Sequence, residues 1–332
     1  MRVGFLLPFH FSLRRPGNGI YEQAINQINS LSKLGVEVTL LSPWELKETN
    51  KFDIVHLFEG GDGCAEFINI PCKKVISPII DSNRSNLLYR IAVEATRNIK
   101  RFNTTQKILF KQFNAADLIL VRSRHEKERV EQGYGIYNKT KIVLNGVTDF
   151  SNIVARKPNI EFDFNKKFAV TLSAYSQERK NTQNFLDSIK NLNLALDFLF
   201  FGYIDDDYRN NLIQKYKNYE NFHFFSVITE EEKKYLFSKC DFFFLPSKHE
   251  GTGLSALEAR SLGAKVLITK FGGTKDYFDS HCHFINPYSK NDMRRKVEAI
   301  IKQSNNKIIG KILSWHDSAK VIIDLYSSLL EQ

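Results

Sequence analysis

The stretch Leu245–Glu258, LPSKHEGTGLSALE, limits the possible folds of this chain more than any other segment. It continues the apolar run CDFFFLP (residues 240–246), which has the length and composition of a buried strand. Pro246 ends that strand because proline has no N–H group to donate to a neighbouring strand. A polar turn follows, and a helical pattern of apolar residues begins at Leu254. The sequence therefore predicts a strand, a glycine-containing loop and a helix N-terminus in succession.

The loop of this stretch has the chemistry of an anion site. Gly251 and Gly253 flank Thr252, and small residues before a helix let a phosphate approach the backbone N–H groups. One exposed helix terminus contributes only about 0.3–1 kcal/mol per charge, so a diphosphate requires further cations. Glu250 and Glu258 stand eight positions apart, too far for a close acid pair. Their spacing suits one carboxylate at a reacting centre and one that binds hydroxyls, while a plain strand–helix connection with solvated glutamates is the alternative.

Length and composition restrict the class of protein. A chain of 332 residues with 42% hydrophobic and 25% charged residues is typical of a soluble protein of about two domains. The four cysteines form no CxxC pair, which favours reduced thiols in the cytoplasm. We expect no transmembrane segment and no signal peptide. The net charge of +10 fits an anionic ligand or an anionic lipid surface, and no nucleic-acid partner is expected because no binding motif is recognisable.

Strands and helices alternate from the start of the chain. RVGFLLP (residues 2–8) reads as a strand, a helical pattern follows to about residue 34, and VEVTLLSP reads as a second strand. This order opens a doubly wound parallel sheet. The connecting loop contains Gly17 and Gly19, but GNG lacks the third glycine of a dinucleotide fingerprint.

A second such unit begins near residue 168, where FAVTLSA reads as a strand and TQNFLDSI as a helix. Arg179 and Lys180 lie on the loop between them. Arginine makes bidentate contacts to phosphate and lysine supplies a point charge, so the pair suits a leaving diphosphate. Solvated surface cations are the alternative.

HEGTGLSALEA (residues 249–259) resembles the Glu-x7-Glu motif of retaining GT-B glycosyltransferases of the family 4 type. ERKN around Arg179 and LNGV at residues 144–147 are similar to further motifs of that family. The resemblance implies an α/β fold of the GT-B type, with two Rossmann-like doubly wound domains facing across a cleft. It implies an acceptor domain at residues 1–150, a nucleotide-sugar domain at 151–312, and a terminal helix at 313–332 that packs back on the first domain.

The resemblance also implies roles for individual residues. Arg179 and Lys180 neutralise the departing diphosphate, and Glu250 contacts the donor sugar or stabilises positive charge at its anomeric carbon. Glu258 binds the ribose hydroxyls. The remaining donor-binding positions are backbone or loop residues: Thr252, Gly253 and Leu254 at the helix start, Gly17 and Gly19 in the first domain, and Val227 near the nucleotide base. No metal and no cofactor are expected, because GT-B enzymes of this type do not hold the donor through a carboxylate–metal motif.

The chain departs from the family at three points. Many relatives have a histidine after a strand such as KKVISPIID (residues 73–81), and here no histidine stands there, with Asp81 the nearest polar candidate. Ala174 replaces an arginine of many relatives, and Asp276 replaces a glutamate. His56 lies within an alternating strand and is expected to be structural rather than catalytic.

These features predict a retaining hexosyl-type transferase, in the cytoplasm or at the inner face of the membrane. It moves a sugar from a UDP- or GDP-linked donor to a glycan or lipid-linked acceptor in bacterial surface polysaccharide synthesis. A catalytically silent subunit that binds a glycan or stabilises a partner is the alternative.

Residues 84–111 carry seven basic residues and one acidic residue, which indicates either a contact with an anionic membrane or a solvated helix face.

Overall fold

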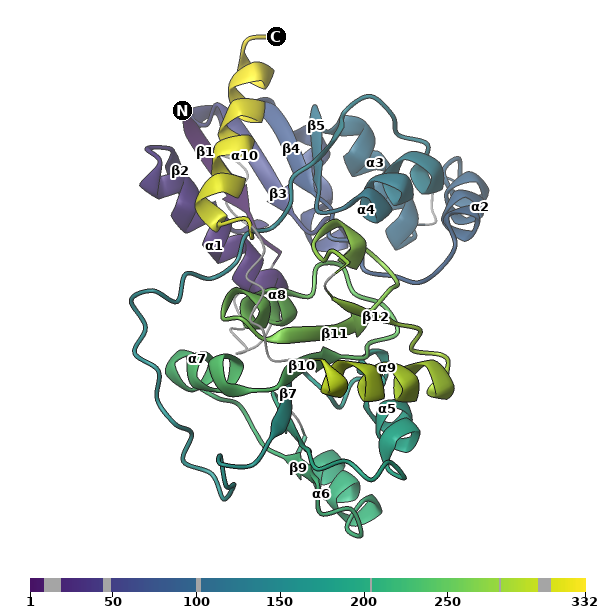
Figure 1. The fold of residues 1–332 in the computed structure, drawn as a ribbon. Coiled ribbons are helices and arrows are strands. Elements are labelled where there is room, and N and C mark those ends of the chain that lie inside the picture. The colour runs from purple at the N-terminus through teal and green to yellow at the C-terminus, as the bar shows by residue number, and fades with distance from the viewer. Residues whose placement is uncertain (9–18, 44–48, 100–102, 204, 281, 304–311) are drawn as a thin grey trace. The chain divides into compact units, whose positions relative to one another are not determined.

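The computed structural model describes residues 1–8, 19–43, 49–99, 103–203, 205–280, 282–303 and 312–332 (Figure 1). The chain divides into two compact units. The first unit contains residues 1–146 and 313–332, and the second contains residues 147–312. The prediction from sequence places these boundaries at 150 and 312. Within the described ranges, no helix combines the length and apolar content that crossing a membrane requires.

The first unit is built on a six-stranded parallel sheet with the strand order β2-β1-β3-β4-β5-β6. Its central strand β3 is buried along its whole length, as expected for a strand covered on both faces. The strands are β1 (Arg2–Leu6), β2 (Glu37–Leu41), β3 (Ile54–Phe58), β4 (Lys73–Ser77), β5 (Leu118–Val121) and β6 (Thr140–Ile142).

The helical elements of the first unit are α1 (Gly19–Lys33), η3 (Asp62–Asn69), α2 (Asn86–Thr96), α3 (Thr105–Ala115), α4 (Arg124–Glu128), η4 (Arg129–Gly133) and α10 (Trp315–Leu330). The basic segment 84–111 contains α2 and the first part of α3. Thr104 starts the second helix, because its side chain accepts a hydrogen bond from the backbone of Lys107.

The C-terminal helix α10 belongs to the first unit and lies beside α1. Ser314 and Asp317 form a capping box at its start. Ile322 and Tyr326 are fully buried in the core that the sheet and α1 share. The backbone at Gly146 lies so close to the start of α10 that a Cβ atom at Gly146 would be 2.1 Å from the backbone nitrogen of Trp315. Glycine is therefore required at position 146.

The second unit contains another six-stranded parallel sheet, with the order β12-β11-β10-β7-β8-β9. Numbered within the unit, this is the 3-2-1-4-5-6 order of dinucleotide-binding sheets, and the order reverses between β7 and β10. The strands are β7 (Phe168–Leu172), β8 (Asp197–Phe201), β9 (Phe222–Phe224), β10 (Phe242–Leu245), β11 (Lys265–Thr269) and β12 (His283–Ile285).

Phenylalanine dominates the core of the second unit. All four residues of β10 are buried, and Phe244 stacks on Phe185 with ring centroids 4.9 Å apart. The helical elements around this core are η5 (Glu178–Lys180), α5 (Thr182–Ile189), α6 (Asp206–Lys215), α7 (Glu230–Lys239), α8 (Leu254–Ser261), η6 (Thr274–Asp276) and α9 (Lys290–Lys302). The prediction of two doubly wound sheets is thus confirmed.

Candidate functional site

The loops that follow β7 and β10 leave the sheet of the second unit at neighbouring strands, where the strand order reverses. Open parallel sheets bind ligands at this point because the loops separate there and leave a crevice. The loop after β7 contains η5, with Arg179 and Lys180. The loop after β10 contains Glu250. Segments about 70 residues apart in the chain are thereby brought together.

Glu250 and the two cations form one cluster. The carboxylate of Glu250 accepts hydrogen bonds from Lys180 Nζ at 2.7 Å and from Arg179 Nη1 at 3.4 Å. The Glu250 residue is only 6% exposed. Burial alone would raise the pKa of Glu250, but the charges of Lys180 and Arg179 outweigh it and hold the pKa below its ordinary value. Glu250 is therefore ionised at neutral pH and serves as counter-ion to both cations.

The main chain of Glu250 is fixed by the turn after β11. Its N–H donates to Phe271 O at 3.2 Å, and its carbonyl accepts from the N–H of Gly273 at 3.0 Å. Gly272 has φ +97°, and a Cβ atom there would lie 2.0 Å from the Glu250 carbonyl oxygen. Glycine is required at position 272 both by the conformation and by this close approach.

Asn181 holds the cation loop in place. It adopts a left-handed conformation with φ 58°, and its side chain donates to the carbonyls of Pro246 and Pro287 at 3.2 and 2.9 Å. These bonds tie the end of η5 to the loops after β10 and β12. The side chain of Lys180 is 12% exposed and that of Arg179 is 40% exposed, so the arginine is the cation more open to solvent.

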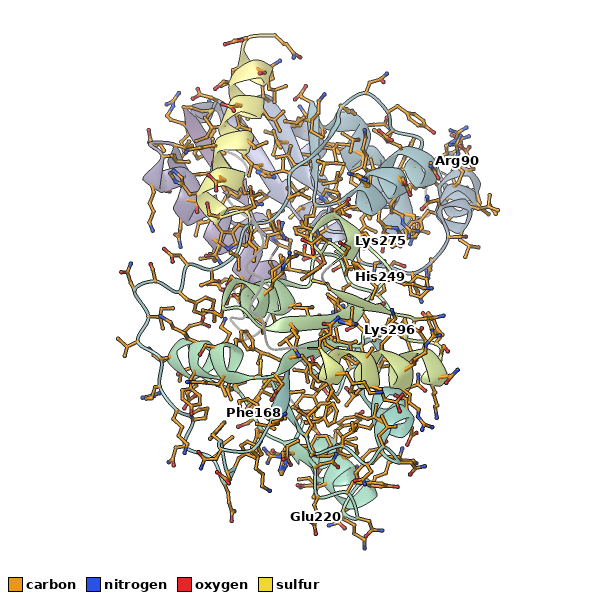
Figure 2. All side chains as sticks on the ribbon, viewed as in Figure 1. Arg90, Phe168, Glu220, His249, Lys275 and Lys296 are labelled. Carbon is orange, nitrogen blue, oxygen red and sulfur yellow. The ribbon has the colours of Figure 1, made fainter. Side chains whose placement is uncertain are left out.

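The start of α8 has the predicted form. Gly253 caps the helix in a left-handed conformation with φ +77°, directly before Leu254. Thr252 is buried, and its hydroxyl donates to the Tyr277 hydroxyl at 3.5 Å. The first N–H groups of any helix lack intrahelical acceptors, so this end of α8 presents donors. His249 lies in the loop just before Glu250 (Figure 2).

Glu258 lies within α8 and forms a second ionic cluster. Its carboxylate accepts from Thr148 Oγ1 at 2.6 Å and from Lys233 Nζ at 3.0 Å. Lys233 also pairs with Glu230 at 2.8 Å. Burial lowers the pKa of Lys233, but the two carboxylates more than compensate and raise it. Sequence reasoning missed Thr148 and Lys233, because their contacts depend on packing between distant segments.

Two further predicted positions lie at other elements. Val227 is 51% exposed after β9, and Gly19 is the first residue of α1 in the first unit. Gly17 lies outside the described residues. In the part of the chain that the structure describes, no group of three or more histidine, cysteine or acidic side chains could hold a metal ion.

In the first unit, His56 is structural, as predicted. It is completely buried and hydrogen-bonds to Tyr326 Oη at 2.6 Å and to Ser77 Oγ at 2.8 Å. Burial lowers the pKa of His56 to about 3, so the ring is neutral at physiological pH. It joins β3, β4 and α10 within the core.

Asp81 belongs to a separate network in the first unit, centred on the buried side chain of Arg122. Arg122 donates to Asp81 Oδ1 at 2.9 Å and to Glu126 Oε1 at 3.1 Å. Glu126 also accepts from the backbone N–H of Ile80 at 2.6 Å. The preceding residue, Ile79, has φ 51°, an uncommon conformation for a β-branched residue. The network fixes the chain where it leaves β4.

The second unit also matches a known family. Residues 155–311 match the family model described as glycosyl transferases group 1. The matched residues all lie within the second unit. Matches to curated relatives cover between 14% and 60% of those relatives' own length. One relative is the O-antigen biosynthesis glycosyltransferase WclY of Escherichia coli, which is 26% identical over 147 residues, or 43% of this chain and 41% of that protein.

Solved structures resemble the whole chain. Sucrose-phosphate synthase of Thermosynechococcus elongatus has a TM-score of 0.80 at 13% identity and is covered over 100% of both chains. HepE of Anabaena, solved with UDP and glucose, has a TM-score of 0.66 at 15% identity, with 100% of this chain and 98% of that chain covered. At these identities the likeness shows the fold alone. The two parallel sheets with flanking helices have the GT-B fold that the sequence predicts.

Proposed function

We propose that the chain is a glycosyltransferase that takes its sugar from a nucleotide-sugar donor bound in the second unit. One observation carries the proposal: Arg179, Lys180 and Glu250 meet at the switch point of a glycosyltransferase group 1 domain. The UDP and glucose in the HepE structure support a nucleoside diphosphate as the donor's activating group.

The two cations would stabilise the charge that develops on the diphosphate as the glycosidic bond breaks. Such fixed charges lower a barrier because they act where charge appears in the transition state. Lys180 and Arg179 are oriented before the donor binds, since Glu250 holds both. A donor diphosphate would take over part of this pairing, and the first N–H groups of α8 would add to it. The proposed reaction needs no metal ion, because these groups supply the positive charge.

Glu250 would then face the anomeric carbon as an ionised carboxylate. Its lowered pKa keeps it negative, which suits stabilisation of an oxocarbenium-like centre. We propose further that the transfer is retaining and moves a hexosyl group, as the resemblance of the Glu250–Glu258 segment to family 4 type GT-B enzymes implies.

Glu258 would bind the ribose hydroxyls of the donor. A carboxylate offers about four acceptor positions, and Thr148 and Lys233 each supply one donor to them, so acceptor capacity remains. Val227, exposed after β9, would lie against the nucleotide base.

The acceptor is proposed as a glycan or lipid-linked glycan of a bacterial surface polysaccharide. The relative WclY is described as an O-antigen biosynthesis enzyme, which supports this class.

The function is tested by a thermal-shift screen of the purified chain with UDP, GDP and ADP at millimolar concentration. A nucleotide that binds only the native state raises Tm, by an amount set by RT ln(1 + [L]/Kd). The proposal predicts a rise with at least one nucleoside diphosphate and its loss in Lys180→Ala. The matching sugar nucleotides are then assayed for transfer to glycan and lipid-linked acceptors. No Tm rise with any nucleotide contradicts the proposal, and binding without transfer favours a silent subunit.

A further inference from the structure

Helix α2 of the first unit exposes large apolar side chains to solvent. Leu87, Leu88 and Ile91 are 66%, 55% and 54% exposed, and Ile99 just beyond the helix is 49% exposed. Single exposed apolar residues are ordinary on a protein surface, but a contiguous group of them marks an interaction site.

The exposed residues form one continuous stripe. Leu87 and Ile91 are four residues apart, and Leu88 and Ile91 are three apart, so all three lie side by side on the helix surface. The opposite face, with Tyr89 and Val93, packs into the core. α2 is therefore apolar on both faces, and only one face has a partner within the described residues.

The stripe belongs to a well-anchored helix. Ser85 caps α2 by accepting from the backbone of Leu88. Arg129 is 1% exposed, stacks 4.4 Å from the ring centre of Tyr89 and donates to the carbonyl of Ser82 at 3.0 Å. Arg129 also donates to the carbonyl of Arg84. These contacts fix the loop before the helix, so the stripe is held in position by the folded core.

Arginines border the stripe. Arg84 precedes the helix, Arg97 caps its end, and both are exposed. Arg90 lies on the helix and is exposed as well (Figure 2). Glu94 is the acidic residue among them and pairs with Arg90 at 3.2 Å and Arg97 at 2.8 Å. The segment 84–99 thus carries a net positive charge of +2, from three arginines and one glutamate.

We propose that α2 lies in the interface of a membrane rich in anionic lipid, with Leu87, Leu88 and Ile91 inserted among the acyl chains. An interfacial helix needs an apolar face at the headgroup boundary and arginines that reach the lipid phosphates, and α2 presents both. The positive border favours an anionic surface over a second copy of this chain, since two copies would bring like charges together.

The structure narrows the segment that the sequence indicated. The predicted patch covers residues 84–111, but Lys107 is only 2% exposed and donates to the carbonyl of Ile99. The ammonium group of Lys107 therefore holds the chain after α2 in place and is not part of the exposed basic surface. The large exposed apolar residues of this segment include Leu87 and Leu88.

The test is sedimentation of the full chain with vesicles of phosphatidylcholine alone and with 30% phosphatidylglycerol, at low and high salt. We expect binding to the anionic vesicles, weakened by salt because screening shortens the reach of the arginines. The triple variant Leu87→Ser, Leu88→Ser, Ile91→Ser is expected to bind at least about 10-fold more weakly. Circular dichroism and nucleotide-induced Tm shifts should match the wild type.

A matched variant carries the same change at exposed apolar residues elsewhere: Val154→Ser, Ile213→Ser, Val321→Ser. It should bind vesicles like the wild type. Three outcomes overturn the proposal: no binding of the wild type to anionic vesicles, equal binding of the α2 variant, or an α2 variant that instead converts a dimer to a monomer in light scattering. The measurement does not depend on sugar transfer, so it separates this proposal from the proposed reaction.

Discussion

The two units share a six-stranded parallel sheet but use charge differently where their strands end. In the second unit, one carboxylate, Glu250, is shared by two cations, and Arg179 remains 40% exposed. In the first unit, one cation, Arg122, is enclosed by Glu126 and Asp81 and is only 8% exposed. The cluster of the second unit therefore has more positive than negative charge, and one of its cations faces solvent. In the cluster of the first unit, the one cation is buried between two carboxylates.

On the proposed function, this difference distinguishes a cluster that binds the donor from one that only supports the fold. An incoming anion can exchange with Glu250, because the cations have hydrogen-bond donors left over. An incoming group gains nothing at Arg122, whose charge is already met by acceptors on two sides. Four experiments examine the comparison, from the largest expected effect to the smallest.

Glu126→Ala should destabilise the first unit the most. It leaves Arg122 buried beside Asp81 alone and removes the acceptor of the Ile80 N–H group. Breaking one partner of a buried pair typically costs about 3–5 kcal/mol. Urea unfolding should show this loss, with Glu126→Gln as a milder control that retains an acceptor oxygen. A loss below about 1 kcal/mol would show that the network is not structural.

Lys180→Ala should reduce turnover with every donor by about 100- to 1,000-fold, the effect of removing one group that stabilises transition-state charge. The fold should survive because Glu250 keeps Arg179 as a partner. The control is Lys248→Ala, which removes a cation from the same site loop whose partner Glu178 is 91% exposed. Steady-state rates at saturating donor measure both, and normal turnover of Lys180→Ala would refute the diphosphate role.

Glu258→Ala should raise the donor KM by roughly 10- to 100-fold, because a hydrogen bond to a charged group contributes about 1.5–3 kcal/mol. Lys233 keeps Glu230 as its partner, so the fold should tolerate the change. Glu230→Ala removes the other partner of Lys233 and serves as the control. The ribose assignment is wrong if KM for the donor stays the same in the Glu258 variant.

The smallest effect concerns acid stability of the first unit. The folded-state pKa of His56 is about 3, below its ordinary value of 6.5, so the unfolded chain binds the proton first. The stability from neutral His56 is complete above pH 6.5 and declines as the pH falls towards 3. Between pH 8 and 5.5 the free energy of unfolding is expected to fall by about 1.4 kcal/mol through this residue.

Urea unfolding at several pH values measures this decline. His56→Gln should remove that part of the pH dependence, whereas His316→Gln on the exposed face of α10 should retain it. If His56→Gln and the wild type lose stability in parallel, the buried imidazole is not the source.

The sequence predicted the second unit in more detail than the first. The stretch before Leu254 combines a proline-terminated strand, a glycine loop and a helix start, and the structure has all three in that order. Such local signals survive because they depend on backbone conformation and neighbouring residues. The sequence could not show that Thr148 and Lys233 contact Glu258, since those contacts span 110 and 25 residues.

The chain's own pattern thus determined two doubly wound sheets and the candidate residues Arg179, Lys180, Glu250 and Glu258. Tertiary structure alone decided which charges meet and which side chains are buried. His56 is buried and hydrogen-bonds to Tyr326, which lies 270 residues further along the chain. The leucines of α2 have the same helical spacing as core residues but face solvent. Periodicity specifies the faces of a helix, but only packing between distant segments determines which of those faces is covered.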